Sequence, residues 1–189
     1  TLTDSSAASD VYKRQANATD SNFFDREILP VQGKNSEGIN DMVIADEGIR
    51  FDASLDKLSG LKTVIENGVI TAGNASQITD GAAAVMVCND AGLKKIQANP
   101  RAEIVSIAVV GDDPVFMLTG PIPASKKALS AANLSIDDID LYEVNEAFAP
   151  VPLAWAKELK ADRKKLNVNG GAMALGPVSY THLTLPTSR

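Results

Sequence analysis

Short apolar runs alternate with segments of helical character along most of this chain of 189 residues. Strand-like runs, rich in β-branched and small apolar side chains, lie at 68–71, 84–88, 104–110, 140–144 and 166–168. Helical spacing or helix-starting signals mark 82–84, 91–98, 124–132 and 148–159, and a short helix or turn is expected at 136–139. Because strands alternate with helices, the pattern predicts an α/β protein with mixed sheets that are covered by helices.

The region from residue 23 to residue 61 departs from this pattern because it is polar and rich in turns. A turn cluster at 33–38 separates two short apolar segments. Three leucines at three-residue spacing predict a short amphipathic helix within 52–61.

Both ends of the chain look foreign to the rest of it. Residues 1–15 are rich in Ser, Ala, Asp and Thr and show no sustained periodicity, whereas residues 177–189 alternate Thr, Leu and Pro. We predict that both are non-native tails, translated from vector or adapter sequence.

Composition narrows the classes of function. The chain is 44% hydrophobic and 22% charged, as in an ordinary globular protein. A net charge of −6 argues against binding nucleic acid or an anionic membrane through a general basic surface. No apolar run is long enough to cross a bilayer, and we expect a cytoplasmic protein. One cysteine, Cys88, cannot form an internal disulfide and fits a reducing compartment.

Two motifs carry the chemistry. Asn145 and Glu146 directly follow an apolar strand-like run, which places an amide and a carboxylate at a strand's end, where α/β sheets usually build their sites. The second motif, Asn-Val-Asn-Gly-Gly-Ala-Met-Ala-Leu-Gly at 167–176, ends a strand on paired glycines that allow close backbone approach to a ligand. An isolated Asn-Glu pair would more simply cap the following helix.

Together with the small-residue block at 71–84 and Thr-Gly-Pro-Ile-Pro-Ala-Ser at 119–125, these motifs resemble the thiolase family over residues 23–176. The resemblance is greatest to bacterial acetyl-CoA acyltransferases or acetyltransferases. It implies a thiolase-type layered α/β fold, incomplete in this chain. The implied organisation is a loop-domain portion, the end of an N-terminal half and the start of a C-terminal half, at 16–77, 78–101 and 102–176.

The resemblance also implies an activity. Thiolases are acyltransferases that cleave a 3-ketoacyl-CoA with coenzyme A (CoA), or join two acyl-CoA molecules by Claisen condensation. CoA and acyl-CoA would be substrates, and no permanently bound cofactor is expected. The intact parent would be a homodimer or homotetramer. One His and one Cys cannot make a usual zinc site, so no metal is expected.

Five residues match positions with roles in the family. Asn145 would fix a water in an oxyanion hole, a kind of donor worth roughly 3 kcal/mol in a dry site. Arg50 would face the adenine end of CoA, unless it is a solvated surface arginine. Ser76 would hydrogen-bond the pantetheine arm, unless it is only a turn serine. Ala147 and Phe148 would form an apolar wall against the same arm.

The family's nucleophilic cysteine, activating histidine and second cysteine have no counterpart here. Thiolases continue past Gly176 with His-Pro, whereas this chain continues with Pro177 and Val178. Cys88 lies in an apolar run and is predicted to be a buried, inert thiol. His182 lies in the suspected tail. We therefore predict that the chain is catalytically inactive; the alternatives are a non-catalytic acyl-CoA-binding protein or a sibling condensing enzyme that uses carrier-bound acyl groups.

Overall fold

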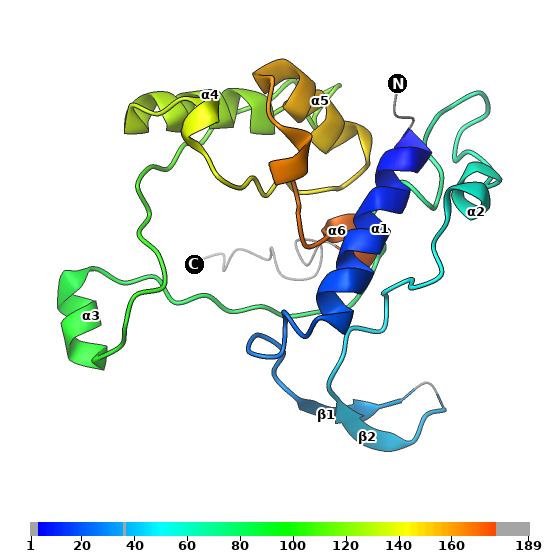
Figure 1. The fold of residues 1–189 in the computed structure, drawn as a ribbon, viewed down its shortest axis with the longest axis horizontal. Helices are drawn as coiled ribbons and strands as arrows, with labels where there is room; N and C mark the ends of the chain where they lie inside the picture. The colour runs from blue at the N-terminus through cyan, green and yellow to red at the C-terminus, as the bar shows by residue number, and fades with distance from the viewer. Residues whose placement is uncertain (1–3, 36, 177–189) are drawn as a thin grey trace, which may run out of the picture.

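The computed structural model describes residues 4–35 and 37–176, and Figure 1 shows their arrangement. The predicted tail at 177–189, with His182, lies outside the described residues. In chain order the helices are α1 (Asp4–Asp20), α2 (Leu55–Ser59), α3 (Asp90–Ile96), α4 (Pro121–Ala132), α5 (Pro150–Leu159) and α6 (Ala172–Leu175). Short 3-10 helices at Ile136–Asp138 and Arg163–Lys165 precede and follow α5.

Helix α1 lies at the centre of the first of two hydrophobic clusters. It packs against α2 and α6, which come from distant parts of the sequence (Figure 1). The buried members of this cluster are Ala8, Val11, Tyr12, Leu58, Ala149, Met173 and Ala174. The interpretation that residues 1–15 show no sustained periodicity is therefore wrong for residues 4–15, which form most of α1. Apolar side chains recur there at helical spacing, and the abundance of Ser, Asp and Thr obscured this spacing. The suggested foreign origin of these residues stays a prediction.

The second cluster lies between α5 and α4, which run side by side (Figure 1). The indole Nε1 of Trp155 donates a hydrogen bond to Ser125 Oγ at 2.9 Å. The ring centroids of Trp155 and Tyr142 are 5.2 Å apart, with the rings tilted by 60°. Both helices begin with proline, at Pro121 and Pro150, where the missing N–H costs no helical hydrogen bond. Helices α4 and α5 thus confirm the helices predicted from the sequence.

The shorter helices also follow local signals. Ser54 caps α2 by accepting a hydrogen bond from Lys57 N, and Leu58 points into the first cluster. Asn89 caps α3 by accepting from Gly92 N at 2.9 Å. Both helices were predicted. Helix α3 has no buried residue and stands away from the rest of the described chain (Figure 1).

The described strands are few. The named sheet is an antiparallel hairpin of β1 (Val31–Lys34) and β2 (Asn40–Val43), with Gly33 opposite Asp41. The strands predicted at 140–144 and 166–168 reduce to one parallel bridge between Tyr142 and Leu166.

Two predicted strands, 84–88 and 104–110, and the predicted helix start at 82–84 have no regular secondary structure. Cys88 is exposed, so the prediction that its thiol is buried is also wrong. Apolar runs become strands only when a neighbouring strand satisfies their main-chain groups, and within the described chain neither run has such a neighbour. No helix in the described residues has the length and apolar character needed to cross a bilayer.

One face of α1 carries polar atoms that the core leaves unpaired. Four of its side chains bury a polar atom that has no hydrogen-bond partner among the described residues: Ser9 Oγ, Tyr12 Oη, Gln15 Nε2 and Thr19 Oγ1. Burial also raises the pKa of the Tyr12 hydroxyl, an effect that the positive charge of Arg50 partly offsets. A buried hydroxyl without a partner costs about 1–3 kcal/mol.

Tyr12→Phe should therefore stabilise the chain by about 1 kcal/mol, because it removes the unpaired hydroxyl and keeps the ring. The matched control is Tyr142→Phe, since the Tyr142 hydroxyl donates to the carbonyl of Ile136 at 2.9 Å. That variant should lose about 1 kcal/mol. Urea unfolding followed by circular dichroism measures both. Destabilisation by Tyr12→Phe would show that its hydroxyl has a partner.

Candidate functional site

The two sequence motifs meet through the side chain of Asn167. Its Oδ1 accepts a hydrogen bond from Val144 N at 2.8 Å, and its Nδ2 donates to Val144 O at 2.9 Å. The same Nδ2 donates to Glu146 Oε1 at 2.6 Å. Asn167 thereby fixes the backbone that leads into the Asn-Glu turn and the carboxylate within that turn. We call the Asn167–Glu146 pair the clamp.

Glu146 is 1% exposed, and the glycine-rich motif closes around its carboxylate. Met173 N donates to its Oε2 at 3.4 Å. A Cβ atom at Gly171 would lie 2.5 Å from the same oxygen, so only glycine permits this approach. Burial raises the pKa of Glu146 to about 6, although the hydrogen bonds from Asn167 and Met173 act in the opposite direction. The clamp therefore includes a carboxylate that takes up a proton in mildly acidic solution.

Asn145 lies immediately before the clamped carboxylate and is exposed. The residues on either side of it, Val144 and Glu146, are both buried and both held by Asn167. The Asn145 side chain has no hydrogen-bond partner in the described part of the chain. An amide presented in this way, on fixed backbone and without a competing partner, can donate to a ligand.

Three of the predicted CoA-binding residues lie together next to this turn. Ala75 and Phe148 form an antiparallel bridge, in which Ser76 N donates to Ala147 O at 3.0 Å and Ala149 N donates to Asn74 O at 2.9 Å. Ser76 and Phe148 are half-buried, and Ala147 is buried. The structure therefore brings Ser76, Ala147 and Phe148 together beside Asn145.

Two side chains that the sequence analysis overlooked, Gln77 and Thr79, hold the segment that contains Ser76 in place. Gln77 Nε2 donates to Gly48 O and to Ala174 O, each at 2.9 Å. Thr79 Oγ1 donates to Leu175 O at 3.0 Å. These hydrogen bonds join the segment that contains Ser76 to the glycine-rich motif and to the loop that precedes Arg50. The three carbonyl groups that accept these hydrogen bonds lie 29, 97 and 96 residues away in the sequence, so no local residue spacing predicts the bonds.

Arg50 is not brought into this group. Its side chain is exposed, and no hydrogen bond or ion pair joins it to another described residue. Its charge acts on Tyr12 of α1 and on the exposed Asp52. The position of Arg50 therefore leaves its predicted contact with CoA untested.

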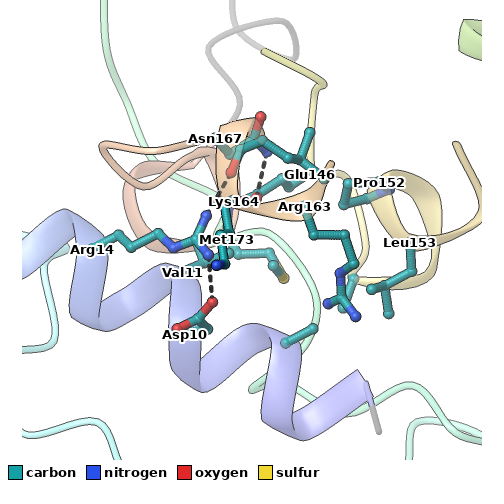
Figure 2. Close-up of a pocket in the computed structure, with 13 residues that line it drawn as sticks. Asp10, Val11, Arg14, Glu146, Pro152, Leu153, Arg163, Lys164, Asn167 and Met173 are labelled. Atoms are coloured by element: carbon teal, nitrogen blue, oxygen red, sulfur yellow. Dashed lines mark hydrogen bonds and ion pairs between the residues drawn. The ribbon is translucent and has the colours of Figure 1, made fainter. Parts of the chain in front are cut away.

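A cavity of about 200 Å³ reaches the clamp from the side of α1 (Figure 2). Glu146, Asn167 and Met173 line it together with Arg14 and Arg163. Asn145, Arg50, Ser76, Ala147 and Phe148 do not. Arg14 is already engaged, since it donates to Asp10 at 2.7 Å and to the carbonyl of Leu166 at 2.5 Å. The cavity is thus separate from the predicted CoA-binding residues. No cluster of potential metal ligands occurs within 4–35 or 37–176.

The raised pKa of Glu146 makes stability depend on pH. The folded chain holds this proton more tightly than the unfolded chain, whose pKa is near 4.5. The stabilisation is fully present below about pH 4.5 and is lost as the pH rises through about 6, an effect of about 2 kcal/mol. The chain should therefore be more stable at pH 5 than at pH 7.5 in urea unfolding.

Glu146→Gln should remove most of this pH dependence, because the amide stays neutral across the range. A smaller slope should remain, since partial burial also raises the pKa of Glu143. Glu158→Gln is the control: Glu158 is exposed, and its pKa is lowered by Lys126. If Glu146→Gln has the same pH dependence as the unaltered chain, Glu146 is not the titrating group.

Asn167→Asp should break the clamp and also remove the hydrogen bond to the carbonyl of Val144. Asn167 has a positive φ of 47°, which Asp tolerates, and the new carboxylate can still accept from Val144 N. It cannot donate to Glu146, and two carboxylates would face each other. A loss of about 3 kcal/mol is expected at pH 7.5, with partial recovery at pH 5 as one carboxyl becomes protonated. Asn169→Asp, at an exposed position, should change stability little.

Comparisons with known proteins identify the family and the fold. The sequence model of the thiolase N-terminal domain matches residues 3–91, and that of the thiolase C-terminal domain matches residues 98–181. The steroid 3-ketoacyl-CoA thiolase FadA6 of Mycobacterium tuberculosis is 46% identical over 178 residues. That alignment covers 94% of this chain and 42% of the relative. The mitochondrial 3-ketoacyl-CoA thiolase of Bos taurus is 45% identical, over 87% of this chain and 41% of the relative.

Solved structures give the same result. Human mitochondrial 3-ketoacyl-CoA thiolase superimposes with a TM-score of 0.86 at 41% identity, over 92% of this chain and 43% of that protein. The acetyl-CoA acetyltransferase of Bacillus anthracis also gives 0.86, at 38% identity, over 93% and 44%. The chain thus spans about two fifths of the length of its relatives, and the predicted α/β, thiolase-type fold is confirmed. This chain belongs to the thiolase family.

Proposed function

We propose that these residues form part of an acyl-CoA thiolase, which cleaves 3-ketoacyl-CoA with CoA or forms acetoacetyl-CoA by condensation. The observation that carries the proposal is the clamp. It holds the backbone on both sides of Asn145, beside the bridge between Ala75 and Phe148. The exposed amide of Asn145 would fix a water that stabilises the developing oxyanion of the thioester. Relatives named 3-ketoacyl-CoA thiolase support this reaction class.

The substrate's pantetheine arm would lie along the bridge between Ala75 and Phe148. Ser76 offers a hydroxyl there, and the half-buried Phe148 offers apolar surface, whereas the neighbouring Ala147 is buried. Pantetheine alternates amide groups with short aliphatic stretches, which suits a wall of this mixed character. A solved structure of the human mitochondrial 3-ketoacyl-CoA thiolase in complex with CoA, which superimposes with a TM-score of 0.85, supports CoA as the ligand class. Arg50 would meet the adenine end.

Catalysis would need groups that this site does not bring together. The chain's one cysteine, Cys88, is exposed and precedes α3, none of whose residues is buried. No histidine occurs at 4–35 or 37–176. A thiolase nucleophile needs a base within hydrogen-bond reach to form the thiolate. We therefore propose that the 189-residue chain alone is catalytically inactive.

The second candidate is a non-catalytic acyl-CoA-binding role. It is favoured by the fact that Ser76, Ala147 and Phe148 come together although no cysteine or histidine joins them. We also propose a cytoplasmic location and, for the intact parent, a homodimer or homotetramer.

A chimera tests the proposed reaction. Residues 4–176, which keep α1 whole, would replace the aligned segment of the Bos taurus thiolase, which supplies the remaining parts of the site. The chimera should cleave acetoacetyl-CoA with CoA, and Asn145→Ala within it should lower kcat about 100-fold to 1,000-fold through loss of an oxyanion donor. Absorbance of the acetoacetyl-CoA enolate reports the rate.

Asn99→Ala is the control, because Asn99 is exposed in a loop and should leave kcat unchanged. An equal kcat in the Asn145→Ala and Asn99→Ala chimeras would reject the role of Asn145. Calorimetric titration of the unaltered 189-residue chain with CoA separates the two candidates. Micromolar binding without turnover supports the binding role, whereas turnover by this chain would contradict its predicted inactivity.

A further inference from the structure

Gln77 joins three segments that are far apart in the sequence. Its Nε2 donates to the carbonyl of Gly48 and to the carbonyl of Ala174, each at 2.9 Å, and Gln77 itself directly follows Ser76. A Cβ atom at Gly48 would lie 3.2 Å from Gln77 Oε1 and 3.5 Å from Ala174 O. The three segments therefore pack closely around one half-buried amide.

The loop at 44–50 depends on this amide for its position. The loop contains neither helix nor strand, and within the described chain no backbone–backbone hydrogen bond joins residues 44–49 to another segment. The hydrogen bond from Gln77 Nε2 to Gly48 O supplies that connection instead. Arg50 lies two residues after Gly48, a span of at most about 7 Å. Gln77 therefore restricts where the backbone of Arg50 can lie.

We propose that Gln77 is a positioning residue for CoA, which holds the loop of Arg50 at a fixed place relative to the segment of Ser76. This inference rests on the proposed function, in which Ser76 meets the pantetheine arm and Arg50 meets the adenine end of the same molecule. The guanidinium of Arg50 is exposed and can pair with the phosphate groups at that end. One ligand gains from both contacts only when the two sites are held at the distance that it spans.

Thr79 provides a contrast within the same segment. Its Oγ1 donates to the carbonyl of Leu175 at 3.0 Å, which ties the segment to the glycine-rich motif. In the part of the chain that the structure describes, no hydrogen bond joins Thr79 to the loop at 44–50. Loss of the Thr79 hydroxyl should therefore disturb only the pantetheine contact, whereas loss of the Gln77 amide should also release the loop of Arg50.

A truncated substrate tests the proposal in the chimera with the Bos taurus thiolase. Acetoacetyl-pantetheine lacks the adenosine and the phosphate groups of acetoacetyl-CoA, so it has nothing for Arg50 to meet. Gln77→Met keeps the length of the side chain but removes the donor. This variant should raise KM for acetoacetyl-CoA about ten-fold more than KM for acetoacetyl-pantetheine, with kcat nearly unchanged. Thr79→Val is the matched control, and it should change KM for the two substrates by the same factor.

A double variant shows whether Gln77 acts through Arg50. Arg50→Ala should raise KM for acetoacetyl-CoA about ten-fold and leave KM for acetoacetyl-pantetheine unchanged. Adding Gln77→Met to Arg50→Ala should then widen the difference between the two substrates no further, because there is no guanidinium left to position. A residue that only stabilises the fold would instead affect both substrates alike, with or without Arg50.

Circular dichroism verifies that each variant folds, and Gln77→Glu, which keeps the shape of the side chain but cannot donate, should repeat the result of Gln77→Met. Equal rises of KM for the two substrates, an unchanged KM for acetoacetyl-CoA in Gln77→Met or Arg50→Ala, additive effects in the double variant, or failure of both Gln77 variants to fold would each overturn the proposal. All of these outcomes leave the proposed reaction intact, since the unaltered chimera still cleaves both substrates. An unaltered chimera without activity would reject the proposed function, and this inference with it.

Discussion

A buried carboxylate held by one amide side chain organises the described structure. Glu146 has almost no contact with solvent, and such a charge would normally be costly to bury. Asn167 and Met173 N supply its hydrogen bonds, and Gly171 allows the backbone to close over it. The chain before Asn145 and the glycine-rich motif thereby meet at one fixed point. Asn145 is positioned there directly, and Ser76, Ala147 and Phe148 lie beside it through the bridge between Ala75 and Phe148, whereas Arg50 lies apart.

The cost of this arrangement is only partly offset, as the pKa of Glu146 shows. Burial raises the pKa of Glu146 more than the hydrogen bonds lower it, so the carboxyl group that joins the two motifs favours its protonated form more than a solvated glutamate does. Strained or costly groups persist in proteins where the surrounding structure fixes them and where they position function. The same reasoning separates the clamp from the unpaired polar atoms of α1. Those atoms position no residue of the candidate site, and they only reduce stability.

Local signals in the sequence predicted α2, α3, α4 and α5, because helical spacing and prolines act within a turn or two. Pro121 and Pro150 stand at the first positions of α4 and α5. Ser54 and Asn89, which cap α2 and α3, had no part in those predictions. The prediction of strands at 84–88 and 104–110 was wrong because a strand, unlike a helix, depends on a distant pairing segment, which its own residues do not reveal. The Asn-Glu turn was recognised, but its clamp was not, because Asn167 lies 21 residues from Glu146. Helix α1 was missed because polar composition obscured a regular apolar spacing.

Asn167 illustrates how two independent demands can reduce the choice of residue at one position to a single type. Its φ of 47° lies in the left-handed region, which glycine and asparagine adopt most readily. Its three hydrogen bonds need a short side chain that accepts one hydrogen bond and donates two. Glycine meets the first demand alone, and glutamine offers the same groups on a longer stem that disfavours this backbone. A library randomised at position 167 and selected for folded protein would therefore converge on asparagine.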